Sequence, residues 1–180
     1  MLKEGTLHFI LTLMFILLGL LVPLIPGEYA HYAELLSPVL FGVILSGILL
    51  SFWEATLIGA LIPLGVCFLY GEVPLLPDTV ILILTYSVTG LFTGIIYSTL
   101  RTALGAVLSG LLAGRIAMGV SSVIFYYRAG DTYSFSQFSG EALLNLWPCI
   151  ILCAVFIPVL TGIFRKQGVM QVLRHEGASR

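Results

Sequence analysis

Arg115 is the residue of this chain whose type and position point most directly to chemistry. It lies in an apolar run, 103–127, of about 25 residues without another charge, and such a run spans a bilayer as a helix. Arginine keeps its charge in essentially any protein environment. Because a charge at mid-membrane is costly, it usually faces the interior of a helix bundle or a wet cavity. We therefore expect Arg115 to contact polar groups at the centre of a membrane protein.

Polar residues accompany Arg115 on one side of its predicted helix. At helical spacing they are Arg115, Gly119, Ser122 and Tyr126, and Leu111 and Leu108 continue that side inward. Two other apolar segments repeat the pattern, one with Thr85, Thr89 and Thr93, the other with Glu141, Asn145 and Pro148. Three helices with polar outer halves predict a cavity that opens outward and is sealed inward.

Depth along these helices limits which groups can meet. At the rise of an α-helix, Arg115 lies about 18 Å below the outer helix end, Asn145 about 9 Å and Glu141 about 3 Å. No carboxylate of the sequence lies at the depth of Arg115. Two interpretations follow: the arginine ties helices together through backbone carbonyls, or it contacts a bound ligand. We favour the ligand, because charges within membranes are usually functional.

The composition indicates the kind of domain that carries these residues. The chain has 180 residues, of which 59% are hydrophobic and 9% charged, with a mean hydropathy of +1.09. Soluble domains are about 25% charged. We expect an all-α integral membrane protein with one six-helix domain, 1–168, and a short polar tail, 169–180. The predicted spans are 6–26, 37–50, 55–70, 79–100, 103–127 and 142–164.

The turns and the basic residues predict the topology. Segments 37–50 and 55–70 are short, so they form either two helices joined by a tight turn, which we favour, or a partly re-entrant stretch. A six-helix bundle with cytoplasmic N- and C-termini leaves Arg128 as the one basic residue outside, in agreement with the positive-inside rule. The basic residues inside are then Lys3, Arg101, Arg165, Lys166, Arg174 and Arg180.

Several kinds of chemistry have no motif in the sequence. There is no phosphate-binding loop, no His-Glu-x-x-His and no Gly-x-Ser-x-Gly. The three cysteines lie in apolar segments, so no disulfide framework is expected. The paired small residues Gly42/Ser46, Gly90/Gly94 and Gly110/Gly114 predict close helix packing. We expect no catalytic residue, metal, cofactor or nucleic-acid partner.

Short stretches along most of the chain resemble one family of membrane proteins. They are Gly19-Leu-Leu-Val-Pro23, Leu36-Ser-Pro-Val-Leu-Phe-Gly42, Val73-Pro-Leu-Leu-Pro-Asp-Thr79, Gly90-Leu-Phe-Thr-Gly-Ile-Ile-Tyr97, Ala113-Gly-Arg-Ile-Ala-Met-Gly119 and Asn145-Leu-Trp-Pro-Cys-Ile-Ile151. In order and spacing they resemble the substrate-binding S components of energy-coupling factor (ECF) vitamin transporters. The first helix departs from that family, since Gly19 is its only small residue where many members have alanines. At 85–89, the sequence Thr-Tyr-Ser-Val-Thr lacks a glutamate that related sequences often carry.

The resemblance implies a function and a site. An S component is a six-helix protein of the cell membrane that captures a vitamin-like micronutrient from outside. It delivers this ligand together with a membrane T component and two cytoplasmic ATPase subunits. The implied pocket lies in the outer loops and the outer halves of the last three helices. The substrate-binding residues that we predict are Arg115, Asn145, Thr79, His31, Glu141, Ser122 and Thr85.

Two other functions remain open at this point. One is a self-standing small-solute carrier or channel in the bilayer. The other is a small intramembrane enzyme or a structural packing protein. A stoichiometric small molecule bound to the purified chain would favour the S component over both.

Overall fold

The chain folds into a bundle of helices, and the computed structural model describes residues 4–24, 37–70, 75–129 and 147–166. These residues form six α-helices and no strand. The helices are α1 (Glu4–Leu20), α3 (Pro38–Leu49), α4 (Phe52–Tyr70), α5 (Val80–Leu100), α6 (Ala103–Ala129) and α8 (Trp147–Lys166). A 3-10 turn, η1 (Val22–Leu24), follows α1, and a π-helical turn, η2 (Leu75–Thr79), leads into α5. The all-α fold class is confirmed for the described residues.

Each predicted apolar segment overlaps one of these helices. The prediction of two helices joined by a tight turn is confirmed, because α3 ends at Leu49 and α4 begins at Phe52. Trp53 and Glu54, predicted to lie in that turn, belong instead to the first turn of α4. The reason is local: Ser51 and Glu54 form hydrogen bonds that cap the start of the helix. The helix therefore begins at Phe52, before the predicted apolar segment 55–70.

Three of the helices are long and apolar enough to cross a membrane. They are Phe52–Tyr70, Pro77–Leu100 and Ala103–Tyr126, and the other apolar helices, His8–Leu24, Pro38–Leu49 and Pro148–Phe164, are shorter. Large apolar side chains are exposed along α1, α4, α6 and α8, for example Phe9 at 67% and Phe68 at 72%. Soluble monomers rarely expose apolar surface on this scale. The surface is therefore suited to contact with lipid.

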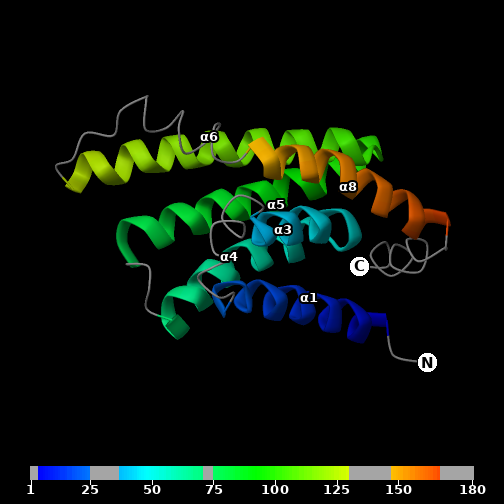
Figure 1. Cartoon of the computed structure of the whole chain (residues 1–180), viewed down its shortest axis with the longest axis horizontal. Helices are drawn as coiled ribbons and strands as arrows, with labels where there is room; N and C mark the ends of the chain where they lie inside the picture. The colour runs from blue at the N-terminus through cyan, green and yellow to red at the C-terminus, as the bar shows by residue number, and fades with distance from the viewer. Residues whose placement is uncertain (1–3, 25–36, 71–74, 130–146, 167–180) are drawn as a thin grey trace.

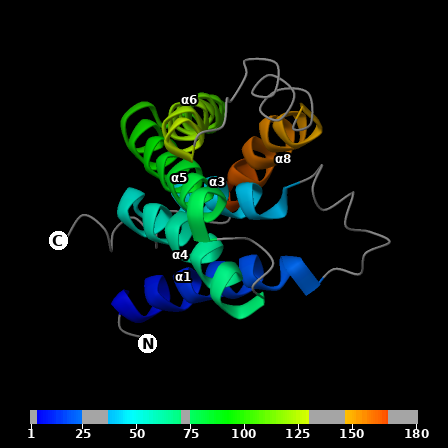
Figure 2. The same ribbon diagram turned by 90° about the vertical axis from the view of Figure 1, so that its left-hand side faces the viewer.

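The helices lie side by side with α5 at the centre. It packs against α3, α4 and α6, whereas α1 packs against α3 and α4, and α8 packs against α6 and α3. Figure 1 shows the start of α1 and the end of α8 at the same end of the bundle. In the view of Figure 2, α1 and α4 lie on one side and α6 and α8 on the other. Polar residues of α3, α5, α6 and α8 can therefore meet inside the bundle.

Small residues bring α5 very close to its neighbours, as the sequence predicts. A Cβ atom added at Gly90 would lie 2.6 Å from the carbonyl oxygen of Ala55 on α4, and one at Gly94 would lie 2.6 Å from Cα of Phe52. On the opposite side, Gly110 and Gly114 of α6 pack against a row of threonines of α5. We call this row and the two glycines the threonine–glycine seam: Thr85, Thr89, Thr93, Gly110 and Gly114. Contacts of this kind fix the rotation of membrane helices against each other.

A short connection joins α5 to α6. Arg101 ends α5 in the left-handed conformation, with φ of 55°, and its N–H donates a hydrogen bond to the carbonyl of Tyr97 at 3.1 Å. Thr102 then accepts a hydrogen bond from the N–H of Ala106 at 3.1 Å, in the first turn of α6. Because only two residues separate the helices, α5 and α6 form an antiparallel hairpin that holds the seam in register.

Candidate functional site

Arg115 lies near the middle of α6, the longest described helix. At the rise of an α-helix it stands about 18 Å from the start of α6 and about 21 Å from its end. Its side chain is half-buried, and its Nη1 donates a hydrogen bond to Sδ of Met118 at 3.5 Å. A thioether sulfur is only a weak acceptor. This contact therefore satisfies little of the capacity of a group with five N–H donors.

Side chains of two other helices lie near the guanidinium. Tyr86 of α5 and Cys149 of α8 lie close enough to interact with Arg115 electrostatically. The Tyr86 hydroxyl is also in hydrogen-bonding contact with the side chain of Ser37, which precedes α3. The candidate site, which we call the Arg115 cluster, thus consists of Ser37, Tyr86, Arg115, Met118 and Cys149.

The Arg115 cluster is rich in neutral groups and poor in negative charge. Among the described residues, no carboxylate forms an ion pair with Arg115. The ion pair found among these residues joins His8 and Glu54, near the starts of α1 and α4. The thiol of Cys149 is fully buried and lies 3.8 Å from that of Cys153. No group of three metal-ligating side chains occurs in the part of the chain that the structure describes. The cluster can therefore offer one positive charge and several neutral donors to an anion.

The polar face predicted on α5 has a different role from the one expected. The hydroxyls of Thr85, Thr89 and Thr93 donate to the carbonyls four residues earlier, at 2.7, 2.8 and 2.7 Å, and all three residues are buried. Thr89 and Thr93 lie in the seam against α6 instead of lining a cavity, which corrects the prediction for them. The physical reason is that a threonine hydroxyl that donates to its own helix already has a hydrogen-bond partner, so the small side chain can pack against another helix.

The structure locates four of the seven predicted site residues. Arg115 is central to the cluster. Thr85 lies at the same level, because its carbonyl oxygen is 3.3 Å from a Cβ built at Gly114, the neighbour of Arg115. Thr79 is buried at the end of η2, and Ser122 is buried two turns further along α6. Glu141, Asn145 and His31 lie outside the described residues.

Sequence reasoning missed the residues of the Arg115 cluster that lie outside α6. Tyr86 is adjacent to Thr85 but about 100° around the helix, so the threonine pattern did not include it. A signal was present, because a tyrosine within an apolar span needs a partner for its hydroxyl. Ser37 and Cys149 are separated from Tyr86 by dozens of residues in the sequence, and no local pattern links the three.

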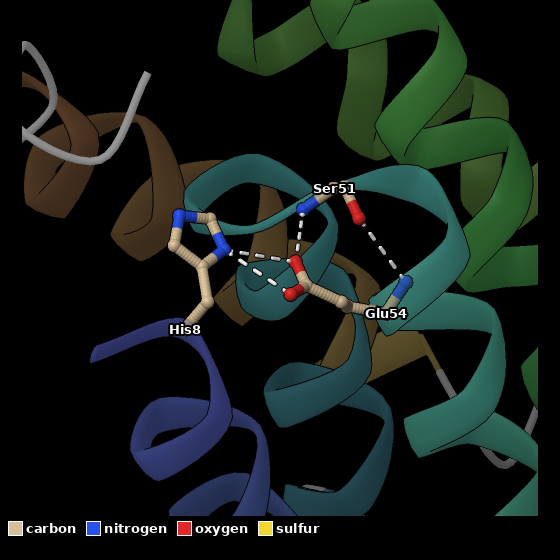
Figure 3. Close-up of polar contacts among 3 residues, drawn as sticks. All are labelled: His8, Ser51 and Glu54. Carbon is tan, nitrogen blue, oxygen red and sulfur yellow. Dashed lines mark hydrogen bonds and ion pairs between the residues drawn. The ribbon is translucent and has the colours of Figure 1, made fainter. Parts of the chain in front are cut away.

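A second polar group occupies the turn between α3 and α4. The N–H of Ser51 donates to Oε2 of Glu54 at 2.8 Å, and the N–H of Glu54 donates to Oγ of Ser51 at 3.3 Å. His8 of α1 adds a contact from its Nδ1 to both carboxylate oxygens of Glu54 at 3.1 Å, as Figure 3 shows. The reciprocal pair is a capping box, and the sequence carries its Ser-x-x-Glu signature. This cluster fastens α1 to the start of α4.

A third polar contact joins η2 to α6. The Tyr126 hydroxyl donates a hydrogen bond to Oδ1 of Asp78 at 3.0 Å. Asp78 lies just before α5, and Tyr126 lies on the polar face that begins with Arg115. The contact holds the far ends of the α5–α6 hairpin together.

Comparison with known proteins identifies no relative of this chain. No family model matches the sequence, and no curated protein or solved structure is significantly similar to it. The fold and the site together define an all-α protein with helices suited to a membrane and a half-buried arginine among them.

Proposed function

We propose that this chain is the substrate-binding S component of an ECF-type importer in the cell membrane. The observation that carries the proposal is Arg115, a half-buried cation near the middle of α6 without a carboxylate partner among the described residues. An ionisable residue inside a membrane helix is by default a functional one. The proposal includes six membrane spans and cytoplasmic termini, and it agrees with the position of the start of α1 and the end of α8 at the same end of the bundle (Figure 1).

In this role the chain binds its ligand and leaves energy conversion to partners. It captures a small vitamin-like molecule from outside and associates with a T component and two cytoplasmic ATPase subunits. Its sequence contains no phosphate-binding loop, so ATP hydrolysis must come from those subunits. The site acts by binding, and no step of the proposal requires catalysis by the chain.

A carrier that works alone is the main alternative, and the positions of the acidic residues support it less. Ion-coupled carriers use carboxylates or similar groups deep in the membrane as relays. In the described helices, the acidic residues are Glu4, Glu54 and Asp78, each at or next to a helix start. Arg115 alone does not provide a site that alternately binds and releases a cation.

The experiment combines ligand analysis with transport. The chain is purified in mild detergent and denatured, and the extract is analysed by mass spectrometry for a small molecule near one equivalent. The same chain is reconstituted into liposomes, alone and with the T component and ATPases of its source organism. Uptake of the identified molecule is then followed with and without ATP.

We expect a bound small molecule, no ATP hydrolysis by the chain alone, and ATP-dependent uptake only with the partner subunits. Concentrative uptake by the lone chain under an ion gradient would contradict the proposal and favour the carrier. Failure of the chain to associate with any T component would contradict it as well. For variants of Arg115, the control is Arg101→Asn, which also removes one arginine. Arg101 is exposed in the α5–α6 turn, and asparagine tolerates its positive φ.

A further inference from the structure

The two ends of α1 are held against α4 in different ways. A Cβ atom added at Gly19, near the end of α1, would lie 2.8 Å from Cγ1 of Ile62 on α4. A Cβ atom added at Gly65 of α4 would lie 2.6 Å from Cδ2 of Leu20. The hydroxyl of Tyr70, the last residue of α4, donates a hydrogen bond to the carbonyl of Leu20 at 2.9 Å. The last turn of α1 is therefore packed closely on α4 and tied to it.

The first half of α1 is packed more loosely. Phe15 is buried, whereas no residue of α1 before it whose side chain is described is buried as a whole. The hydroxyl oxygen of Thr12 is shielded from solvent without a hydrogen-bond partner in the part of the chain that the structure describes. Thr85 and Thr161, by contrast, donate to the carbonyl four residues earlier. Because a buried hydroxyl without a partner costs free energy, packing at Thr12 contributes little to holding the start of α1.

A polar contact holds the start of α1. Nδ1 of His8 lies 3.1 Å from both carboxylate oxygens of Glu54, in the first turn of α4 (Figure 3). Because an ionised carboxylate can only accept hydrogen bonds, Nδ1 must carry a proton in this contact. Protonation of the second ring nitrogen adds a positive charge, and charge-assisted hydrogen bonds are about twice as strong as neutral ones. The strength of this contact therefore depends on the charge of His8.

The contact has few ionisable neighbours among the described residues. α1 packs against α3, α4 and η1, and neither α3 nor η1 contains an ionisable side chain. In α4, Cys67 and Tyr70 lie about 20 Å or more from Glu54 along the helix axis. α1 has one other ionisable residue, Glu4, one turn before His8. Since histidine is the side chain whose charge ordinarily changes between pH 5 and 8, pH in this range acts on the contact through His8.

We propose that His8 and Glu54 form a proton-dependent clasp that closes the start of α1 onto α4. Closure favours the protonated imidazole, because the carboxylate stabilises its charge. The clasp is therefore closed at mildly acidic pH and weakens as the pH rises through the titration of His8. When the clasp opens, the start of α1 moves away from α4, while the contacts of Gly19 and Leu20 hold the other end. This device is independent of which molecule the chain binds.

The test measures the position of each end of α1 relative to α6. Nitroxide spin labels are attached at exposed positions, in one protein through Phe9→Cys and Leu104→Cys, and in a second through Leu18→Cys and Val123→Cys. Both proteins carry Cys67→Ala, because Cys67 is the free cysteine that is not buried. The chain is reconstituted in phosphatidylcholine nanodiscs at constant ionic strength. Distance distributions are recorded by pulsed electron paramagnetic resonance near pH 5 and pH 8, the limits of the histidine range.

We expect one distance between the labels at positions 9 and 104 near pH 5, and a second, open population near pH 8. The ratio of open to closed protein should rise by about 5- to 10-fold, the difference between a charge-assisted and a neutral hydrogen bond. The labels at positions 18 and 123 should give the same distance at both pH values. Thr12→Val, which removes the hydroxyl without a partner, should lower the open population at both pH values and keep its change with pH.

Two variants remove the clasp, and a third is their control. His8→Gln cannot gain a proton, and Glu54→Gln carries no charge, so each should abolish the change of the distance distribution with pH. Glu4→Gln makes the same change as Glu54→Gln on α1 itself and should leave the pH response intact. Because the two clasp variants alter different helices, misfolding of one leaves the other as the test.

Several results would overturn the inference. A distance distribution that is the same at both pH values would exclude a proton-dependent clasp, and so would a full pH response in His8→Gln or in Glu54→Gln. Loss of the response in Glu4→Gln alone would assign it to that residue. An equal change between positions 18 and 123 would show that the whole of α1 shifts and that its end at Leu20 is not fixed.

Discussion

The hydroxyl of Thr93 on α5 lies where a side chain at Gly110 on α6 would begin. A Cβ atom built at position 110 would overlap Oγ1 of Thr93 and lie 3.0 Å from the carbonyl oxygen of Thr89. The hydroxyl cannot easily turn away, because it donates to that same carbonyl at 2.7 Å. This contact fixes the spacing of α5 and α6, the two helices that carry Tyr86 and Arg115.

Gly110→Ala should destabilise the protein by about 1–3 kcal/mol, the usual cost of overpacking. The matched control is Gly162→Ala on α8, where a Cβ atom meets nothing within 4 Å. The control should be neutral or more stable by up to about 1 kcal/mol, because alanine favours the helix. Unfolding by sodium dodecyl sulfate titration measures both. Adding Thr93→Ala should recover part of the Gly110→Ala loss, and equal stability of the two glycine variants would contradict the seam.

Ser51→Ala should cost about 0.5–2 kcal/mol, the usual cost of removing an N-cap. The variant leaves the N–H of Glu54 without its 3.3 Å bond to the serine hydroxyl. Ser98→Ala is the control, since the exposed Ser98 only bonds the carbonyl of Ile95 in its own helix. It should change stability by less than about 0.5 kcal/mol. Equal effects of the two substitutions would contradict the capping box.

His8 and Glu54 should be energetically coupled. A double-mutant cycle of His8→Ala and Glu54→Gln should give a coupling of about 0.5–3 kcal/mol, as for residues in direct contact. The contact is half-buried, with side-chain exposures of 15% and 24%, so solvent screens it only in part. Combining His8→Ala with Tyr70→Phe should be additive, because Tyr70, the last residue of α4, donates its 2.9 Å hydrogen bond to the Leu20 carbonyl at the other end of α1. Additive behaviour of His8 and Glu54 would show that this contact does not contribute to holding α1 against α4.

The topology prediction is tested by reporter fusions. Fusions at Lys3 and at Arg180 should both report the cytoplasm, because the basic residues lie predominantly at that side in a six-span arrangement. A fusion at Asp131, in a predicted outer loop, should report the outside. An external C-terminus would contradict the six-span bundle, whatever the function of the chain.

The helices themselves could be predicted from the sequence. Apolar runs long enough to form helices are local properties, and their interruption at Ser51 and at Arg101 is also local. The importance of Arg115 is equally a property of its own segment, because a single charge among about 25 apolar residues is costly wherever the helix packs. The Ser-x-x-Glu capping signature at Ser51 and Glu54 is also a local pattern, although the apolar pattern alone predicts a turn at 51–54.

The composition of the site was decided only by the tertiary structure. Threonines at four-residue spacing fit a cavity wall and a packing seam equally well, because the hydroxyl can bond either a ligand or its own helix. Which of the two occurs depends on the helix that lies opposite, here the glycine face of α6. The meeting of Ser37, Tyr86, Arg115 and Cys149 likewise requires the rotations of four helices. Those rotations are set by contacts between residues far apart in the chain, so local sequence patterns do not contain them.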